Sequence, residues 1–286
     1  MIRSLLVWLI GLAVTVFFSV WVNTHAWLQR PNLACRCEAL GRRWTRLILR
    51  LAGVRVRVID ADRADWSAGS VVVANHQSWF DVFALTAYLP GRVRFVAKQE
   101  LTKIPVFGRA WRNCGHIPLD RSDRKHAIRS LDQAAEDVLE ESLAIIMFPE
   151  GTRSPDGRLS SFKKGAFVLA LTAGVPVVPV GISGSRDVMR KGSFRVRGGE
   201  IRIRIGEPIR IDGYGVGDRA ELLRLSRLAV AGLIEGGDAE ADAQANPRAD
   251  AEVGGSATSG REGVSQGPAG SQREITRIDN SRDSQT

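Results

Sequence analysis

The hydrophobic pattern divides the chain into three regions. Residues 5–22 form an apolar run without a charged side chain, and residues 33–51 repeat apolar positions at the three- and four-residue steps of an amphipathic helix. Short apolar runs then alternate with helical patterns, and beyond Gly236 large apolar residues become rare. We therefore expect a membrane anchor over 1–52, a folded domain over 53–235 and a disordered tail over 236–286.

The first region predicts a membrane helix. The 18 residues of the run would span about 27 Å as a helix, close to a bilayer core. Arg3 precedes them and six arginines follow, so the positive-inside rule places the folded domain on the cytoplasmic face, that of the plasma or inner membrane in a bacterium. A cleaved signal peptide is the alternative, although the basic segment would impede export. The pattern leaves open whether the helix spans the bilayer or enters one leaflet.

The second region predicts a basic amphipathic helix, of the kind that rests on an anionic membrane surface. Apolar side chains on one side oppose arginines on the other: Leu33, Cys37, Leu40, Trp44, Leu47 and Leu51 against Arg36, Arg43, Arg46 and Arg50. Small residues on one face of the first helix would let this second helix approach closely: Ser4, Gly11, Thr15 and Ser19.

The folded domain alternates strand and helix patterns, which is typical of an α/β fold with a mixed, largely parallel sheet flanked by helices. Strands are expected at 54–58, 71–74, 93–97, 143–148 and 175–182, with a hairpin over 194–205 that turns at Gly198-Gly199. Helices are expected near 80–89, 125–140, 164–173 and 219–234. Two prolines in 175–182 favour an edge or terminal position for that strand.

Composition narrows the possible partners. The apolar share of 44% supports a packed core, and the formal net charge is +9. Residues 236–286 carry nine acidic and five basic side chains, so the tail has a charge of −4 and the rest +13. A basic body indicates an anionic partner, and the absence of a basic cluster or reading motif argues against nucleic acid. The three cysteines match no zinc or disulfide framework, which favours reduced thiols.

The segment Asn75-His76-Gln77-Ser78-Trp79-Phe80-Asp81 follows a buried strand, where an α/β sheet usually places its chemistry. Positions five apart lie about 140° apart on a helix and on opposite faces of a strand, so His76 and Asp81 meet only where the chain bends. Ser78 and Asp81 form a capping-box pattern that supplies this bend. The pair is a candidate general base. Alternatively, Asp81 only caps a helix and His76 is an ordinary loop histidine.

The segment 148–154, with sequence FPEGTRS, predicts a phosphate contact. Gly151 lets the backbone approach a ligand, Thr152 offers a hydroxyl, and Arg153 offers a bidentate guanidinium. Arg121, at the end of another apolar segment, is a second candidate, and Lys98 after the strand 93–97 is a weaker one. A surface turn with an ion pair is the alternative for 148–154.

Together these segments resemble the glycerolipid acyltransferase family, most closely its 1-acylglycerol-3-phosphate acyltransferases, over roughly 44–211. The family's motif NHxxxxD is matched by Asn75, His76 and Asp81, and its motif FPEGTRS is present whole. An apolar strand ending in arginine is matched by the segment through Arg121, with Pro118 where the family has an aromatic or aliphatic residue. The proline-containing apolar strand is matched by 175–180.

The resemblance implies a mechanism. His76 would deprotonate the acceptor hydroxyl, Asp81 would hold the imidazole, and the oxygen would attack an acyl thioester directly, without an acyl-enzyme. The donor would be acyl-CoA or acyl carrier protein, with no cofactor and no metal. The acceptor's phosphate and glycerol would be held by Lys98, Arg121, Glu150, Gly151, Thr152 and Arg153.

The expected reaction is acylation of the free sn-2 hydroxyl of lysophosphatidic acid, a membrane lipid, to give phosphatidic acid. The same chemistry on another lysolipid, such as a lyso-ornithine lipid or a lysophospholipid, is one alternative. A non-catalytic membrane protein that binds anionic lipid is the other.

Overall fold

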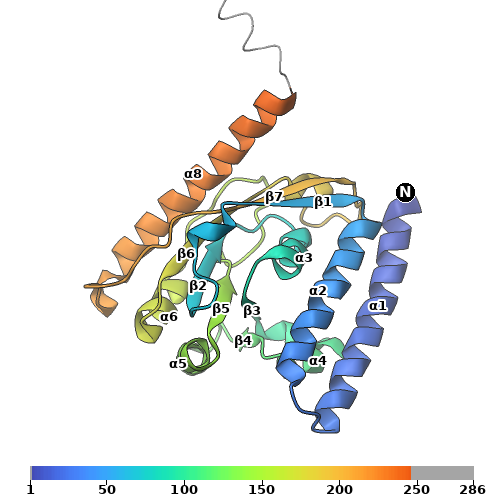
Figure 1. Cartoon of the computed structure of the whole chain (residues 1–286), viewed down its shortest axis with the longest axis horizontal. Coiled ribbons are helices and arrows are strands. Elements are labelled where there is room, and N and C mark those ends of the chain that lie inside the picture. Colours follow the sequence, from blue (N-terminus) through green and yellow to red (C-terminus); the bar gives the residue numbers. More distant parts are fainter. Residues whose placement is uncertain (1, 246–286) are drawn as a thin grey trace, which may run out of the picture. The chain divides into compact units, whose positions relative to one another are not determined.

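The computed structural model describes residues 2–245 (Figure 1), so most of the predicted tail, 246–286, lies outside the described residues. Seven strands form one sheet in the order β1-β7-β6-β2-β5-β3-β4. The strands are β1 (Val54–Ile59), β2 (Ser70–Ala74), β3 (Arg92–Lys98), β4 (Ile117–Leu119), β5 (Leu143–Met147), β6 (Val177–Ser183) and β7 (Gly199–Ile205). All neighbours pair in parallel except β6 and β7, which confirms the mixed, largely parallel sheet.

Helices cover both faces of the sheet. They are α1 (Ile2–Trp27), α2 (Leu33–Leu51), α3 (Trp79–Tyr88), α4 (Phe107–Asn113), α5 (Arg124–Glu141), α6 (Gly165–Ala173), α7 (Ser185–Val188) and α8 (Arg219–Ala245). Short 3₁₀ turns occur at η1 (Ala61–Arg63), η2 (Gln99–Lys103) and η3 (Val216–Asp218). Helix α8 continues through Ala245, ten residues beyond Glu235, so the predicted start of disorder at Gly236 is wrong for this stretch.

The central strand β2 explains how the two faces are filled. All its residues are buried, and successive side chains point to opposite faces. Val72 and Ala74 pack with α2 and α3, whereas Val71 and Val73 pack with α5, α6 and α8. In Figure 1, α1 and α2 run side by side on the α3 side of the sheet, away from α5, α6 and α8. The purely apolar run in the sequence is thus a strand covered on both faces.

The predicted edge position of 175–182 is wrong, because β6 lies inside the sheet between β7 and β2. Its prolines occupy positions where an amide hydrogen is not needed. Pro176 precedes the strand, and its carbonyl accepts from Val71 N at 3.0 Å. Pro179 lies just beyond the last β6–β7 pair, Val180 with Ile205, and its carbonyl accepts from Gly206 N at 2.8 Å.

The predicted hairpin over 194–205 is also wrong. Only β7 is a strand, and its partners are β1 and β6. The residues before it run irregularly beside α1 and α7: Val196 N donates to Ser4 Oγ at 3.0 Å, and Arg197 N donates to Val188 O at 2.9 Å. The alternating apolar and basic side chains there suggested a strand, but the partner is a helix nearly two hundred residues earlier.

Helix α1 is attached to the α/β domain at both ends. Near its start, Ser4 Oγ donates to Val196 O at 3.3 Å and Trp8 Nε1 donates to Phe194 O at 2.8 Å. Near its end, Asn23 Nδ2 donates to Val106 O at 2.9 Å. The helix is long and apolar enough to cross a membrane, and only 22% of its most apolar 18-residue window is buried. It therefore lies along the domain while exposing an apolar face.

Helix α2 uses part of its basic side for contacts within the protein. Arg42 donates to the carbonyls of Leu89 and Gly91, and Arg46 donates to Ala87 O at 3.2 Å while lying over the Tyr88 ring. Thr15 accepts from Trp44 Nε1 at 3.1 Å, so the predicted small face of α1 meets α2 at this residue, whereas Ser4 contacts Val196 and nothing lies within 4 Å of a Cβ placed on Gly11. These contacts leave fewer arginines of α2 for a membrane surface than the sequence pattern suggests.

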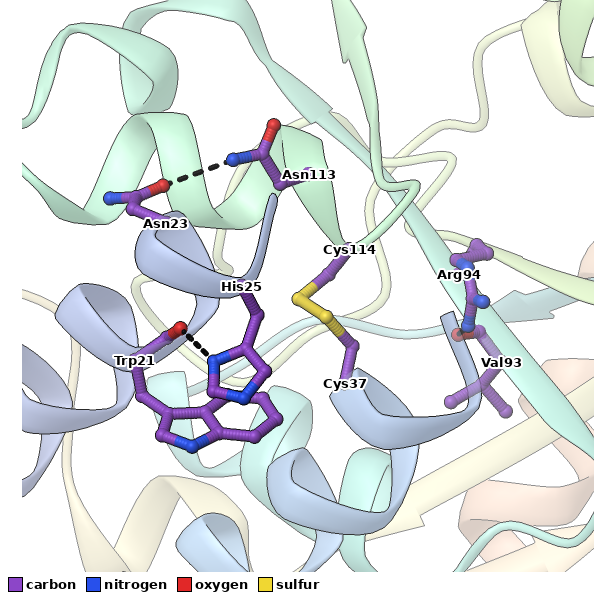
Figure 2. Close-up of a disulfide and its surroundings, with 8 residues drawn as sticks. All are labelled: Trp21, Asn23, His25, Cys37, Val93, Arg94, Asn113 and Cys114. Carbon is purple, nitrogen blue, oxygen red and sulfur yellow. Dashed lines mark hydrogen bonds between the residues drawn. A yellow bond between two sulfur atoms is a disulfide. The ribbon is translucent and has the colours of Figure 1, made fainter. Parts of the chain in front are cut away.

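A disulfide joins Cys37 on α2 to Cys114 at the end of α4 (Figure 2), so the prediction of reduced thiols is wrong for these two residues. Their Cα atoms lie 5.5 Å apart, and 77 residues separate them in the sequence. Because only the tertiary fold brings these two cysteines together, no local spacing pattern in the sequence predicts the pair. The side chain of Cys35 lies outside the part of the chain that the structure describes.

Candidate active site

His76 and Asp81 meet as the bend predicts. His76 Nδ1 lies 2.8 Å from Asp81 Oδ2, and this oxygen also accepts from Gln77 N at 2.7 Å and Ser78 N at 2.8 Å. Ser78 has an extended backbone and caps α3, with its Oγ accepting from Phe80 N at 3.2 Å. The helix cap and the His–Asp pair are therefore one structure, in which the cap holds the carboxylate under the imidazole.

The surroundings leave one ring nitrogen of His76 available. Asp81 is fully buried, and its carboxylate lies in position to accept a hydrogen bond from Nδ1, which leaves Nε2 as the ring nitrogen that faces the cavity. Within the described residues Nε2 makes no hydrogen bond, and the ring lines a cavity while stacking on Phe148 at 4.0 Å between ring centroids. This is the geometry of a general base.

Glu150 connects the segment 148–154 to the loop that carries His76. Its Oε1 accepts from His76 N at 2.7 Å, and its Oε2 accepts from Ser160 N at 3.0 Å and Ser160 Oγ at 2.6 Å. Ser154 N adds a hydrogen bond to His76 O at 2.7 Å. Glu150 is buried and is not among the described residues that line the cavity. Its carboxylate therefore braces the loop that carries His76.

Gly151 lies where two cations converge. Its φ is +77°, a conformation that favours glycine, and its carbonyl accepts from Arg121 Nη1. A Cβ at this position would lie 3.0 Å from Lys163 Nζ and 3.2 Å from Arg121 Nη1. The missing side chain thus lets both cations approach the turn after β5.

Arg153 and Thr152 complete the basic mouth of the cavity. The Arg153 guanidinium lies 5.0 Å from the centre of the Trp79 ring. Partial burial lowers the pKa of Arg153 and the nearby charge of Asp81 opposes this shift, so the group stays cationic. Lys191 Nζ donates to Thr152 Oγ1 at 3.2 Å and to Arg153 O at 2.8 Å.

Lys98 is the loosest member of the predicted set. It ends β3 and lines the cavity, but its side chain is 59% exposed and forms an ion pair with Glu100 at 3.5 Å. Sequence reasoning missed Lys191, which no motif spacing marks. The structure brings His76, Arg121, Gly151, Thr152 and Arg153 to one cavity and leaves Glu150 behind it.

The cavity has a volume of about 910 Å³ and two unlike ends. His76 and the cations form one end. The remainder is lined mainly by apolar side chains of α1, α2, α3, β3 and α4, among them Val7, Phe18, Trp44, Phe83, Phe95 and Trp111. Pockets of this size hold small molecules of some length. The arrangement suits a ligand with an anionic head and a long apolar chain.

His116 is a second histidine in this cavity. Its Nδ1 accepts from Phe95 N at 3.2 Å, and its ring stacks on Trp111. Burial, and to a smaller extent the charge of Arg94, lower the pKa of His116 to about 3. The ring is therefore neutral at physiological pH. Among the described residues no group of three or more His, Cys, Asp or Glu side chains could hold a metal ion.

The comparisons define the class of protein. The chain belongs to the Acyltransferase family, whose sequence profile matches residues 55–183. It is 34% identical over 222 residues to the human 1-acyl-sn-glycerol-3-phosphate acyltransferase alpha, an alignment that covers 75% of this chain and 78% of the relative. It is 37% identical over 170 residues to the 1-acyl-sn-glycerol-3-phosphate acyltransferase of Limnanthes alba, covering 59% of this chain and 60% of that protein.

A solved structure supports the same assignment. The crystal structure of the 1-acyl-sn-glycerophosphate (LPA) acyltransferase PlsC from Thermotoga maritima superposes with a TM-score of 0.69 at 27% identity, covering 82% of this chain and 95% of that one. The chain spans about 60% of the length of the Limnanthes relatives.

Proposed function

We propose that the protein transfers an acyl chain from an acyl thioester to the sn-2 hydroxyl of lysophosphatidic acid. The observation that carries the proposal is the position of His76, at the junction of a cationic mouth and an apolar cavity. A phosphate at Arg121 and Arg153 leaves a neighbouring hydroxyl near the imidazole, while an acyl chain lies in the apolar part. The names of the relatives support the same pair of substrates.

The reaction follows from the tautomer of His76. Nε2 removes the proton of the acceptor hydroxyl, and Asp81 stabilises the imidazolium through Nδ1. The oxygen attacks the thioester carbonyl, and the tetrahedral intermediate collapses by breaking the carbon–sulfur bond. The thiolate takes the proton from Nε2, so the products are an ester and a free thiol. No acyl-enzyme forms, and the donor is acyl-CoA or acyl carrier protein.

We assign the substrate contacts by their charge. Arg121, Arg153 and the exposed cation Lys98 line the cavity and suit a phosphate. Glu150 has both carboxylate oxygens engaged by His76 N and Ser160, and a carboxylate repels phosphate. We therefore propose that Glu150 positions His76 and does not hold the substrate.

We also propose that α1 enters a single leaflet. A helix of 26 residues is about 39 Å long, and hydrogen bonds join both of its ends to the α/β domain, which supports a helix that stays on the domain. Its exposed apolar side chains then lie in lipid. The positive-inside rule favours the cytoplasmic face, whereas a disulfide is uncommon in the cytoplasm. Protease access to tags before α1 and after α8, in sealed vesicles of known orientation, decides both points.

The test of the activity uses two histidines. His76→Ala removes the base and should reduce acyl transfer by about 10²- to 10⁴-fold. His126→Ala is the matched control, because His126 has a similar carboxylate contact outside the cavity. Purified protein is offered lysophosphatidic acid, a lysophospholipid and a lyso-ornithine lipid with acyl-CoA or acyl carrier protein, and products are read by mass. Unchanged transfer by His76→Ala contradicts the mechanism, and a preference for another acceptor contradicts the substrate.

A further inference from the structure

A second hollow lies at the start of α1. It has a volume of about 640 Å³ and is lined by the first turn of α1 and by residues 195–198. Ser4 holds the two segments together by its two hydrogen bonds with Val196. Arg3, Arg195 and Arg197 line the hollow, and all three are exposed.

Three arginines line this hollow, and none of them has an acidic partner among the described residues. Among the side chains that the structure describes, no carboxylate forms an ion pair with any of them, whereas Arg42, Arg63, Arg92 and Arg224 are all paired. Like charges around one hollow repel one another, so an anion bound there would be attracted by all three. The hollow therefore has the charge of an anion site.

Glycines shape the path of Arg3. A Cβ on Gly198 would lie 2.6 Å from Arg3 Nη1, and a Cβ on Gly53 would lie 3.5 Å from Arg3 Cζ. The Arg3 side chain thus lies back over the domain, into the space that these glycines leave open.

Exposed apolar side chains border the arginines. Ile2 is 78% exposed, Phe194 is 77% exposed, and Trp8 contacts Phe194 edge-on at 5.8 Å between ring centroids. Aromatic and apolar side chains beside arginines are typical of the interface between the hydrocarbon and the headgroups of a membrane. The setting favours a lipid headgroup over a soluble anion.

The hollow also adjoins the catalytic cavity. Val196 lines both, and Val7 and Trp8, one helical turn after Arg3, line the cavity. A lipid with its head in the hollow would lay its chains along the exposed face of α1. We propose that Arg3, Arg195 and Arg197 form a binding site for the headgroup of an anionic phospholipid in the membrane, separate from the phosphate-binding mouth at Arg121 and Arg153.

The proposal requires α1 to lie at a membrane surface and does not depend on acyl transfer. The full-length protein is mixed with phosphatidylcholine vesicles, with or without a fifth of phosphatidylglycerol, and binding is measured by flotation. Two arginines near an anionic surface contribute about 1 kcal/mol each, so Arg195→Ala/Arg197→Ala should weaken binding to the anionic vesicles by about 30-fold. Binding to pure phosphatidylcholine should not change.

A charge-matched control removes two exposed cations from the opposite side of the sheet, in the variant Lys125→Ala/Arg129→Ala, and should bind like wild type. Arg195→Lys/Arg197→Lys should recover most of the binding, because it keeps the charge. Acyl transfer to substrates dispersed in detergent should be unchanged, which shows that the variants fold.

Three outcomes would overturn the proposal. The first is equal binding of Arg195→Ala/Arg197→Ala and wild type to anionic vesicles, and the second is an equal loss in the control. The third is release of wild type from anionic vesicles by millimolar inorganic phosphate or coenzyme A at constant ionic strength, since this would mean that the site takes a soluble phosphate. Failure of the wild type to transfer an acyl chain in detergent would count against the proposed function alone.

Discussion

Two histidines of this protein have nearly the same partner and very different surroundings. His76 Nδ1 lies 2.8 Å from Asp81 Oδ2, and His126 Nδ1 lies 2.9 Å from Asp123 Oδ2. Each aspartate also accepts backbone amides at the start of a helix, α3 or α5. The side chains of His76 and Asp81 are 15% and 0% exposed, against 63% and 46% for the pair on α5.

The difference shows that a His–Asp hydrogen bond does not by itself make a base. The pair on α5 is solvated and lies outside the cavity, so water screens its charge. The ring of His76 stacks on Phe148, cations line the same cavity, and Glu150 accepts a hydrogen bond from the backbone of His76. A third histidine, His116, is half-buried and has no carboxylate partner among the described residues, and desolvation lowers its pKa so that it stays neutral. Among the described histidines, His76 alone combines a cavity, facing cations and a carboxylate partner.

The largest expected effect comes from removing the charge under each histidine. Asp81→Asn keeps an acceptor for Nδ1 but cannot stabilise the imidazolium, so kcat should fall by about 10²- to 10⁴-fold. Asp123→Asn should leave kcat within twofold. Steady-state rates with saturating substrates measure both. Similar losses in the two variants would mean that the surroundings do not distinguish the pairs.

The next effect concerns the cations that face His76. Arg153→Ala should raise the KM for the lysolipid acceptor by about 10- to 100-fold, the equivalent of one charged hydrogen bond, and change the KM for the acyl donor little. Arg158→Ala, which removes an exposed arginine of the same loop that does not line the cavity, is the control. A larger change in the KM for the acyl donor would mean that Arg153 binds the donor and not the lysolipid acceptor.

A smaller effect is expected at the apolar end of the cavity. Cys37 and Cys114 line its wall, and a link across 77 residues stabilises the fold by about 4 kcal/mol in loop-closure terms. Cys37→Ser should lower Tm by several degrees and broaden the range of acyl chains accepted, with little change in kcat for the best donor. Cys35→Ser is the control. An unchanged Tm would show that the link adds no stability.

The smallest effect is a pH dependence due to His116. Its pKa of about 3 lies below the ordinary 6.5, so below pH 6.5 the unfolded chain binds a proton that the folded chain does not. Stability is therefore complete above 6.5 and declines as pH falls toward 3, by at most about 1.4 kcal/mol per pH unit. His116→Phe should flatten the fall of Tm between pH 7 and 5, and His126→Ala should not. Equal slopes of Tm against pH in His116→Phe and the wild type would contradict the lowered pKa of His116.

Features that depend on neighbours in sequence could be predicted. The bend at Ser78, the meeting of His76 with Asp81 and the turn at Gly151 are local, and the structure has them where the sequence places them. The alternation of apolar runs with helical patterns likewise predicts the parallel sheet, because each run is a strand covered on both faces.

Features that depend on residues far away in the sequence could not be predicted. Pro179 suggested an edge strand because proline has no amide hydrogen to donate. Only the fold shows that the pairing with β7 ends just before Pro179, so no hydrogen bond is lost there. Cys37 forms a disulfide with Cys114, 77 residues away, and Glu150 accepts a hydrogen bond from His76 N, 74 residues away. The 194–197 segment alternates like a strand because one side meets α1 and the other meets solvent.

The attachment of α1 at both ends has a consequence for how a membrane grows. An enzyme held in one leaflet takes its acceptor from that leaflet and returns its product there. Every turnover would then add a two-chain lipid to the same side of the bilayer, and the opposite side would expand only as fast as lipids cross over. The hydrogen bonds of Trp8 and Asn23 would thus make transbilayer movement a separate requirement for symmetric growth.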